Sequence, residues 1–395
     1  MSNPVYSFPW VISPLSFEEF ESEYFEKKFI HIKRNRSDYF SPALSYQAIE
    51  EYLYNETLKF PSTRLTNAKE DVPSEKYVMG EKVVTSNLLK HFVEGSTIVL
   101  SGLHEHVAGL GELVSNLSKQ FYQRFQTNVY ITPKGSQGFK VHYDTHDVFV
   151  LQIHGKKTWK IYKDNPVSLP NKLMEFAPGK YQVGEVEETI VAEAGDLIYI
   201  PRGIMHQAET NDEMSIHVTL GMLGYTWTDL LIESVLEFSK TNDSLRKFLP
   251  REMLRNSARE DHQHYFSDLF SAMSSSISLQ DSVNRFKREI SASQKINIKN
   301  LLTQGNSVAD IAESSVFEIR QNVLFLIKRK GENVVLEWQG KEVEFPMFMD
   351  PAIHFIAKIK IPFNLAAVPD CVDHNGKVVF VTRLIKEGLL SIKIN

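Results

Sequence analysis

The sequence predicts an α+β protein whose central part is an all-β sandwich or barrel. Between about residues 127 and 222, short runs rich in β-branched and aromatic residues alternate with Gly, Pro, Asn and Asp, which is the pattern of many short strands separated by turns. Residues 227–295 change to helical patterning, and residues 296–395 mix helical and strand patterns. At 395 residues the chain also exceeds the size of one ordinary core, so we expect two or three domains.

Composition narrows the class of protein. Hydrophobic residues make up 42% and charged residues 24%, as is ordinary for a globular protein in water. The formal net charge of -5 gives no electrostatic case for nucleic-acid binding, and no apolar run approaches the roughly 18 residues of a membrane span. The single cysteine, Cys371, excludes an internal disulfide and a cysteine-based metal site. With no signal-peptide pattern at the N-terminus, a reducing, cytoplasmic location is favoured.

The N-terminal region is expected to hold a helix, a strand and a second helix. In SFEEFESEYFEKK, aromatic residues recur at helical spacing, and Ser16 with Glu19 three residues later has the pattern of a capping box. FIHIKR alternates as a strand does. Residues 111–126, GELVSNLSKQFYQRFQ, have the pattern of an amphipathic helix.

The remaining elements follow from the same patterns. The central strands are expected at NVYITP, FKVHYD, DVFVLQIHG, KTWKIYK, ETIVAEAGD, LIYIPRG and MSIHVTLGM. Helices are expected at WTDLLIESVLEFSK and SVNRFKREISASQ. The last region should contain a helix at SVADIAES, two strands at NVLFLIKRK and NVVLEWQGKEVEF, a helix at PAIHFIAKI, and a strand followed by a helix in KVVFVTRLIKEGLL.

Two histidines and an aspartate are the strongest chemical signal. His142 and Asp144 are two residues apart on a predicted strand, so their side chains share one face. His206 follows 64 residues later, on a return strand that we expect on the opposite side of a small barrel. Two imidazoles and one carboxylate are the ligand set of non-haem Fe(II) oxygenases, which leaves positions for a bidentate cosubstrate and O₂. A structural zinc site would instead be closed, typically by cysteines.

Two neighbouring features distinguish this set from an incidental HxD triplet. In AGDLIYIPRGIMHQAE, a tight turn, an apolar strand and a Pro-Arg-Gly turn lead directly to His206. Lys157 follows His142 by 15 residues on the next predicted strand, where a cation could reach the distal carboxylate of a dicarboxylate bound to the metal. His146 would join the pocket only if the strand continued, and we expect the strand to end at Thr145. Trp159 is expected in the core.

These runs resemble the JmjC-type ribosomal oxygenases of the cupin superfamily, which are Fe(II)- and 2-oxoglutarate-dependent protein hydroxylases. The resemblance is strongest over residues 128–229, in NVYITPKGSQGFKVHYDTHDVFVLQIHGKKTWKIY, GDLIYIPRGIMHQAE and SIHVTLGMLGYTWTDLL, in that order. ISPLSFEEFESEYFEKKFIHIKR resembles the N-terminal region of the same family. The resemblance implies His142, Asp144 and His206 as metal ligands, and Lys157 as the partner of the 2-oxoglutarate C5 carboxylate.

The resemblance also implies roles for less distinctive residues. Asn128 and Tyr130 match positions that line the cosubstrate pocket in this family, whereas on their own they would be a strand-edge amide and a core aromatic. His217 and Thr219 are two residues apart on one predicted strand, so their side chains share a face. His217 therefore either points into the barrel near the cosubstrate or is a buried, hydrogen-bonded histidine with no direct role.

The resemblance implies three regions. Residues 1–226 would be a double-stranded β-helix (jelly-roll) barrel with an N-terminal α/β extension, residues 227–295 a helical dimerisation region, and residues 296–395 a winged-helix-like domain. A winged helix suggests DNA binding by analogy, but residues 300–395 hold 11 Lys or Arg and 11 Asp or Glu. Because a DNA-binding domain normally carries a basic face, we expect this domain to pack on the dimer or to guide substrate.

The expected activity is hydroxylation of an arginine or histidine side chain of a protein, by resemblance a ribosomal protein, and the sequence does not choose between the two targets. The same centre could act on another peptide, or as a demethylase by hydroxylating an N-methyl group. A non-enzymatic cupin-fold regulator would not need the intact ligand set. A cupin isomerase would typically use more histidines and would leave Lys157 without a purpose.

Overall fold

The protein divides into two compact units, Met1–Gly224 and Tyr225–Asn395. Among the residues described, no helix combines the length and the apolar character that a membrane crossing requires. The computed structural model describes the chain except for residues 1–4, 164, 295–299, 302–310, 321–322 and 394–395.

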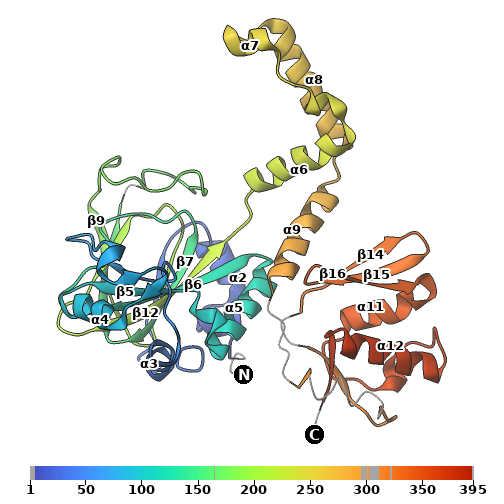
Figure 1. The fold of residues 1–395 in the computed structure, drawn as a ribbon, viewed down its shortest axis with the longest axis horizontal. Helices are drawn as coiled ribbons and strands as arrows, with labels where there is room; N and C mark the ends of the chain where they lie inside the picture. Colours follow the sequence, from blue (N-terminus) through green and yellow to red (C-terminus); the bar gives the residue numbers. More distant parts are fainter. Residues whose placement is uncertain (1–4, 164, 295–299, 302–310, 321–322, 394–395) are drawn as a thin grey trace. The chain divides into compact units, whose positions relative to one another are not determined.

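The first unit combines an N-terminal α/β extension with a two-sheet barrel (Figure 1). The larger sheet has the strand order β1-β10-β7-β12-β6-β5-β2, and the smaller sheet has the order β11-β8-β9. All pairings in both sheets are antiparallel. The elements are α1 (Phe8–Ile12), α2 (Phe17–Glu19), β1 (Ile30–Ile32), α3 (Tyr46–Asn55), β2 (Thr63–Thr66), β3 (Val78–Met79), β4 (Lys82–Val83), α4 (Thr85–Val93), β5 (Thr97–Ser101), α5 (Ala108–Phe121), β6 (Arg124–Thr132), β7 (Asp147–His154), β8 (Lys156–Tyr162), β9 (Val186–Glu193), β10 (Leu197–Ile200), β11 (His206–Glu209) and β12 (Ser215–Leu223).

The strand β7 explains why the central sequence is so apolar. On one face, Phe149 and Leu151 join the core under the N-terminal helices, and on the other face Val148 and Val150 pack against the smaller sheet. A strand buried on both faces is a continuous hydrophobic run, which is what DVFVLQI is. The larger sheet therefore forms one wall of the barrel and the floor on which the N-terminal extension packs.

The N-terminal predictions are confirmed in outline. The Ser16 side chain accepts a hydrogen bond from the backbone of Glu19 at 3.0 Å, and the helix continues as a π-helical turn, Phe20–Tyr24, before β1. The helix predicted over 111–126 was wrong at its C-terminal end. Tyr122 adopts a left-handed conformation (φ 50°), which ends α5, and the chain enters β6 at Arg124 because this run pairs with β12.

The second unit contains helices and two small sheets, and β14, β15 and β16 lie side by side in it (Figure 1). The capping box between Thr226 and Asp229 begins the first helix. The elements are α6 (Trp227–Thr241), α7 (Arg251–Arg255), α8 (Glu260–Ser276), α9 (Leu279–Ser293), β13 (Phe317–Ile319), β14 (Leu326–Lys330), β15 (Asn333–Trp338), β16 (Lys341–Pro346), α11 (Asp350–Lys358), α12 (His374–Lys386) and β17 (Leu390–Ile392).

Two predictions for the C-terminal region were wrong. NVVLEWQGKEVEF is two strands, because Gln339 and Gly340 both have positive φ and form a tight hairpin turn. KVVFVTRLIKEGLL is a helix followed by a strand, in the opposite order to the one expected. Asp373 caps this helix through Gly376 N, and the buried side chains recur at helical spacing. Of the predicted helix SVADIAES, residues 307–310 lie outside the described residues and residues 311–314 are not helical. The dimerisation and winged-helix assignments stay predictions.

Candidate metal centre

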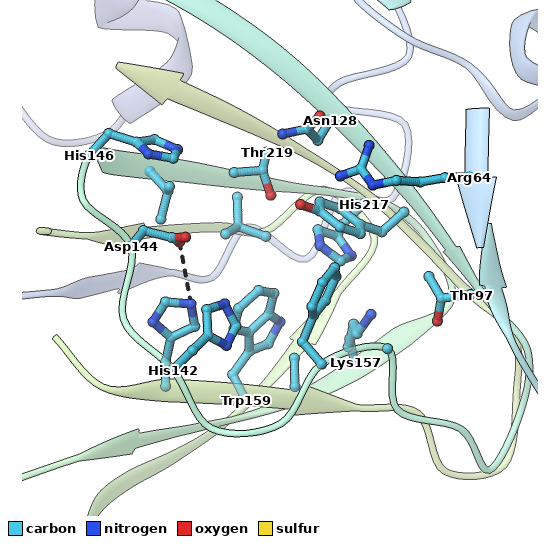
Figure 2. A pocket seen from close by; sticks show the side chains of 17 residues that line it. Arg64, Thr97, Asn128, His142, Asp144, His146, Lys157, Trp159, His217 and Thr219 are labelled. Atoms are coloured by element: carbon cyan, nitrogen blue, oxygen red, sulfur yellow. Dashed lines mark ion pairs between the residues drawn. The ribbon is translucent and has the colours of Figure 1, made fainter. Parts of the chain in front are cut away.

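The three residues predicted as metal ligands come together at one end of the barrel. Each of His142, Asp144 and His206 offers a ligand atom within 4.8 Å of the other two, and no other such group occurs in the described part of the chain. Asp144 Oδ2 lies 3.6 Å from His206 Nε2, the contact drawn as a dashed line in Figure 2. This donor set fits a divalent transition metal with open positions.

The backbone places the two histidines side by side rather than across the barrel. His142 N donates to His206 O at 3.1 Å, and His206 N donates to His142 O at 2.8 Å. The expectation that they would lie on opposite sides was therefore wrong. FKVHYD is also not a regular strand, because this isolated bridge is the only β-pairing within it. Tyr143 still points away from the two ligands on either side of it and is buried beside Met205.

Hydrogen bonds fix the orientation of both imidazoles. His142 Nδ1 lies 2.8 Å from Lys140 O, and His206 Nδ1 lies 2.9 Å from Ile204 O. A carbonyl can only accept, so each Nδ1 carries the proton and each Nε2 keeps its lone pair for a metal. Burial, with the neighbouring His142, lowers the pKa of His206 to about 4, so this imidazole is neutral at pH 7, as a ligand must be.

A cavity of about 300 Å³ adjoins the three ligands, and Lys157 reaches into it from β8 (Figure 2). The side chain is 4% exposed, and Nζ donates to Thr132 Oγ1 at 2.9 Å. Burial lowers the pKa of Lys157 to about 7. Lys156 faces the other way and pairs with Glu193 at 2.8 Å in solvent, so the register expected for β8 is confirmed. A buried cation in a cavity is a site for an anion.

Comparisons with known proteins agree with this geometry. Residues 111–230 match the JmjC domain family. Residues 111–230 therefore form a JmjC domain, and the chain is similar to proteins named as ribosomal oxygenases. A protein of Dictyostelium discoideum named bifunctional lysine-specific demethylase and histidyl-hydroxylase NO66 is 33% identical over 258 residues, covering 61% of this chain and 48% of that protein. Ribosomal oxygenase 1 of Danio rerio is 30% identical over 278 residues, covering 64% and 49%.

The chain therefore spans about half the length of these curated relatives. Among solved structures, the Escherichia coli ribosomal oxygenase YcfD in complex with cobalt and 2-oxoglutarate superposes with a TM-score of 0.56 at 15% identity. That match covers 96% of this chain and 99% of YcfD, and at this identity it shows the fold alone. The barrel is thus a JmjC/cupin fold.

The JmjC domain also places Asn128, Tyr130 and His217 on the cavity wall. Tyr130 and His217 stack with ring centroids 4.8 Å apart, and His217 Nδ1 has no hydrogen-bond partner among the described residues. Burial, with the charge of Lys157, lowers the pKa of His217 well below its usual value. Asn128 Oδ1 accepts a hydrogen bond from Ser101 Oγ at 2.6 Å. The structure brings these three predicted residues together with Lys157.

Sequence reasoning assigned no such place to four residues on the cavity wall or beside Lys157: Arg64 and Thr132 were not singled out, Trp159 was expected only in the core, and the expectation that His146 would stay outside the pocket was wrong. Thr132 and Trp159 lie two residues beyond Tyr130 and Lys157 on the same strand faces, so strand alternation would have found them. Trp159 is buried as expected, but it also lines the cavity. Figure 2 shows His146 and Arg64 at the cavity as well. Arg64 comes from β2, and only the order of strands in the sheet, which no local pattern shows, brings it there.

Proposed function

We propose that this protein is an Fe(II)- and 2-oxoglutarate-dependent oxygenase that hydroxylates a side chain of another protein. The observation that carries the proposal is the pairing of an open metal site with a buried lysine. Three ligand atoms converge within 4.8 Å, and Lys157 stands in the adjoining cavity with only the hydroxyl of Thr132 as a hydrogen-bond partner in the described chain. A 2-oxoglutarate molecule would satisfy both, through its keto acid end and its distal carboxylate.

Each residue then has a defined task. His142, Asp144 and His206 hold the metal by one face and leave three octahedral positions open. Iron with 2-oxoglutarate and O₂ supplies the oxidising power to hydroxylate an unactivated C–H bond. Lys157 binds the C5 carboxylate, and the hydrogen bond from its Nζ to Thr132 fixes its direction.

Asn128, Tyr130 and His217 form the wall beside the bound cosubstrate. His217 is buried and Tyr130 is half-buried, and their rings stack, so they exclude water from the space between the metal and Lys157. In that space the unpartnered Nδ1 of His217 is a polar atom available to the cosubstrate.

A ribosomal protein is the substrate that the relatives suggest, and Arg64 favours histidine over arginine or methylated lysine as its target. Arg64 Nη1 donates to Ser101 Oγ at 2.7 Å, and Ser101 in turn donates to Asn128 Oδ1. Asn128 must then turn its NH₂ group away from Ser101, so this wall presents donors and a permanent positive charge. No carboxylate within the described residues pairs with Arg64. The wall suits an uncharged side chain with an acceptor nitrogen.

The size of this charge effect can be approximated. A cationic target about 5–6 Å from Arg64, at an effective dielectric constant of about 20, would be repelled by about 3 kcal/mol, or roughly a hundredfold in affinity. The test is a set of three peptides that differ only in the target residue: histidine, arginine or trimethyl-lysine. We expect Fe(II)- and 2-oxoglutarate-dependent addition of one oxygen atom to the histidine peptide. Release of formaldehyde from the trimethyl-lysine peptide alone would instead support the demethylase.

We also propose that the protein is a homodimer and works in the cytoplasm, where ribosomes are. Trp227, Leu231, Ile232 and Leu236 of α6 are each more than half exposed, which is unusual for such large apolar side chains on one helix. A second copy of the chain would cover them. Light scattering should give twice the chain mass of 45.3 kDa, and a strict monomer at micromolar concentration would contradict the dimer.

Within the described part of the C-terminal region, the one Lys-Arg-Lys run is paired with acidic residues. Lys328 pairs with Glu337 at 3.2 Å, Arg329 lies 3.5 Å from Asp350, and Lys330 pairs with a further glutamate of β16. These pairs neutralise the Lys-Arg-Lys turn, which supports a role in packing or in guiding substrate.

A further inference from the structure

Four polar residues, Asp147, Arg202, Tyr199 and Glu26, form a ring of contacts that includes residues close in sequence to Asp144 and His206. Asp147, the first residue of β7, is fully buried, and its carboxylate accepts three hydrogen bonds. Tyr199 OH donates to Oδ2 at 2.5 Å, and Arg202 donates to Oδ1 from its backbone N at 3.2 Å and from Nη1 at 3.1 Å. The Asp147 carboxylate thus joins the start of β7 to the turn that follows β10.

The N-terminal extension closes the ring. Arg202 Nη2 pairs with Glu26 Oε1 at 2.6 Å, and Glu26 N donates to Tyr199 OH at 3.0 Å. Glu26 adopts a left-handed conformation (φ 57°), which is uncommon for a residue with a side chain and is maintained here by these two contacts. The circuit therefore runs from Asp147 to Arg202, Glu26, Tyr199 and back to Asp147.

The buried charges of Asp147 and Arg202 depend on the other members of the ring for their stabilisation. Burial raises the pKa of Asp147 even though Tyr199 and Arg202 stabilise its charge. Burial alone would lower the pKa of Arg202, but the carboxylates of Asp147 and Glu26 raise it overall. A buried charge that loses one partner is costly, so the ring resists being opened at any one bond.

The ring also joins the two segments that carry the metal ligands. Asp147 is three residues after Asp144, and Arg202 is four residues before His206. Between these points, Gly203 N donates to Asp144 O at 3.0 Å. The segment that carries Asp144 is not part of a regular strand, and within the described chain its backbone is joined to residues 203–206 by three hydrogen bonds, the reciprocal His142–His206 pair and this bond from Gly203. The contacts across to residues 201–206 are what determine where Asp144 stands relative to His206.

We propose that Asp147, Arg202, Tyr199 and Glu26 are positioning residues that hold Asp144 and His206 at metal-binding separation, so that the N-terminal extension is a working part of the metal centre. The proposal rests on the metal site of the proposed function. Loss of the ring would leave all three ligands and the three backbone hydrogen bonds between their segments in place, but would remove the side-chain contacts that fix the residues flanking Asp144 and His206, which would weaken metal binding without removing any ligand.

The test compares Asp147→Asn with a matched variant at the other end of β10. Asp196 is also buried, 1% exposed, and its carboxylate accepts hydrogen bonds from the backbone of Arg34 at 2.9 Å and of Glu193 at 3.1 Å. Asp196→Asn therefore disturbs a similar buried carboxylate that does not adjoin the metal ligands. Mn(II) affinity of the full-length protein is measured by calorimetry, and the melting temperature of the metal-free protein is measured alongside it.

We expect both variants to melt at lower temperature, but only Asp147→Asn to lose Mn(II) affinity, by about 10–100-fold, the range typical of residues that support metal ligands. Should the Asp147 variant fail to fold, Glu26→Gln provides the same test, because Glu26 is a partly exposed member of the ring. Its control is Glu23→Gln, since Glu23 is exposed in the same segment and, among the described residues, pairs only with Lys28, at 3.7 Å. Glu26→Gln should weaken Mn(II) binding several-fold, and Glu23→Gln should not.

Equal Mn(II) affinity in the Asp147 and Asp196 variants, or in the Glu26 and Glu23 variants, would show that the ring is only a structural feature and would overturn the proposal. If the unmodified protein binds no Mn(II), the metal site itself fails, and with it the proposed function. The two failures are therefore distinguishable from the same titrations.

Discussion

Replacing Lys157 by alanine should abolish tight binding of 2-oxoglutarate while leaving the metal site intact. The side chain is 4% exposed, and Thr132 Oγ1 is its only hydrogen-bond partner among the described residues, so the C5 carboxylate would be its counter-ion. Breaking one partner of a buried charge pair costs about 2–5 kcal/mol, or about 30-fold to several thousand-fold in affinity. The pKa of Lys157 is about 7, so about half of the free protein carries an uncharged Lys157 at pH 7, and this lowers the 2-oxoglutarate affinity by only about a factor of two.

The assay is calorimetric titration of 2-oxoglutarate into the Mn(II)-loaded protein, with Mn(II) affinity measured separately. Lys157→Met keeps most of the side-chain volume without the charge and should behave like Lys157→Ala, whereas Lys157→Arg should be intermediate because its fork is longer and planar. Lys156→Ala is the control, since Lys156 points to solvent and pairs with Glu193. Unchanged 2-oxoglutarate affinity in both Lys157→Ala and Lys157→Met would refute the cosubstrate assignment.

Two further predictions concern the same cavity. Burial lowers the pKa of Lys157 to about 7, and a bound carboxylate would raise this pKa again, so 2-oxoglutarate binding above pH 7 takes up a proton. The affinity for 2-oxoglutarate should therefore fall about tenfold per pH unit above pH 7 and level off below pH 7. A calorimetric affinity that stays constant from pH 6.5 to 9 would contradict this prediction. A methyl group at Gly221 would lie 2.7 Å from the His146 ring, so the substitution Gly221→Ala should displace that ring. Peptide hydroxylation, measured by mass spectrometry, should become slower while the Mn(II) affinity stays unchanged. Loss of Mn(II) binding would show that His146 supports the metal instead.

The candidate ligand set was predictable from the sequence, but its arrangement was not. Residue type and the HxD spacing identified His142, Asp144 and His206, and strand alternation gave the correct faces for Lys156 and Lys157. The pairing of His142 directly with His206 depends on two backbone hydrogen bonds between segments 64 residues apart, which no local pattern encodes.

Non-local contacts account for the other differences. Arg64 reaches the cavity because β2 pairs with β5 at the edge of the larger sheet, far in sequence from the ligands. In the last helix, β-branched residues near Val378 favoured a strand, but the cap at Asp373 and burial of Phe380 and Leu384 on one helical face decided for a helix. Tertiary packing therefore overrode local propensity there.

The most direct test of the central claim is mass spectrometry of ribosomal proteins after incubation of ribosomes with this protein, Fe(II), 2-oxoglutarate and O₂. We expect one histidine-containing tryptic peptide to become heavier by one oxygen atom, only when 2-oxoglutarate is present. The double variant His142→Ala/His206→Ala should leave that peptide unmodified. The same mass increase with the double variant, or none with the unmodified protein on ribosomes from its own source, would contradict metal-dependent histidine hydroxylation by this protein.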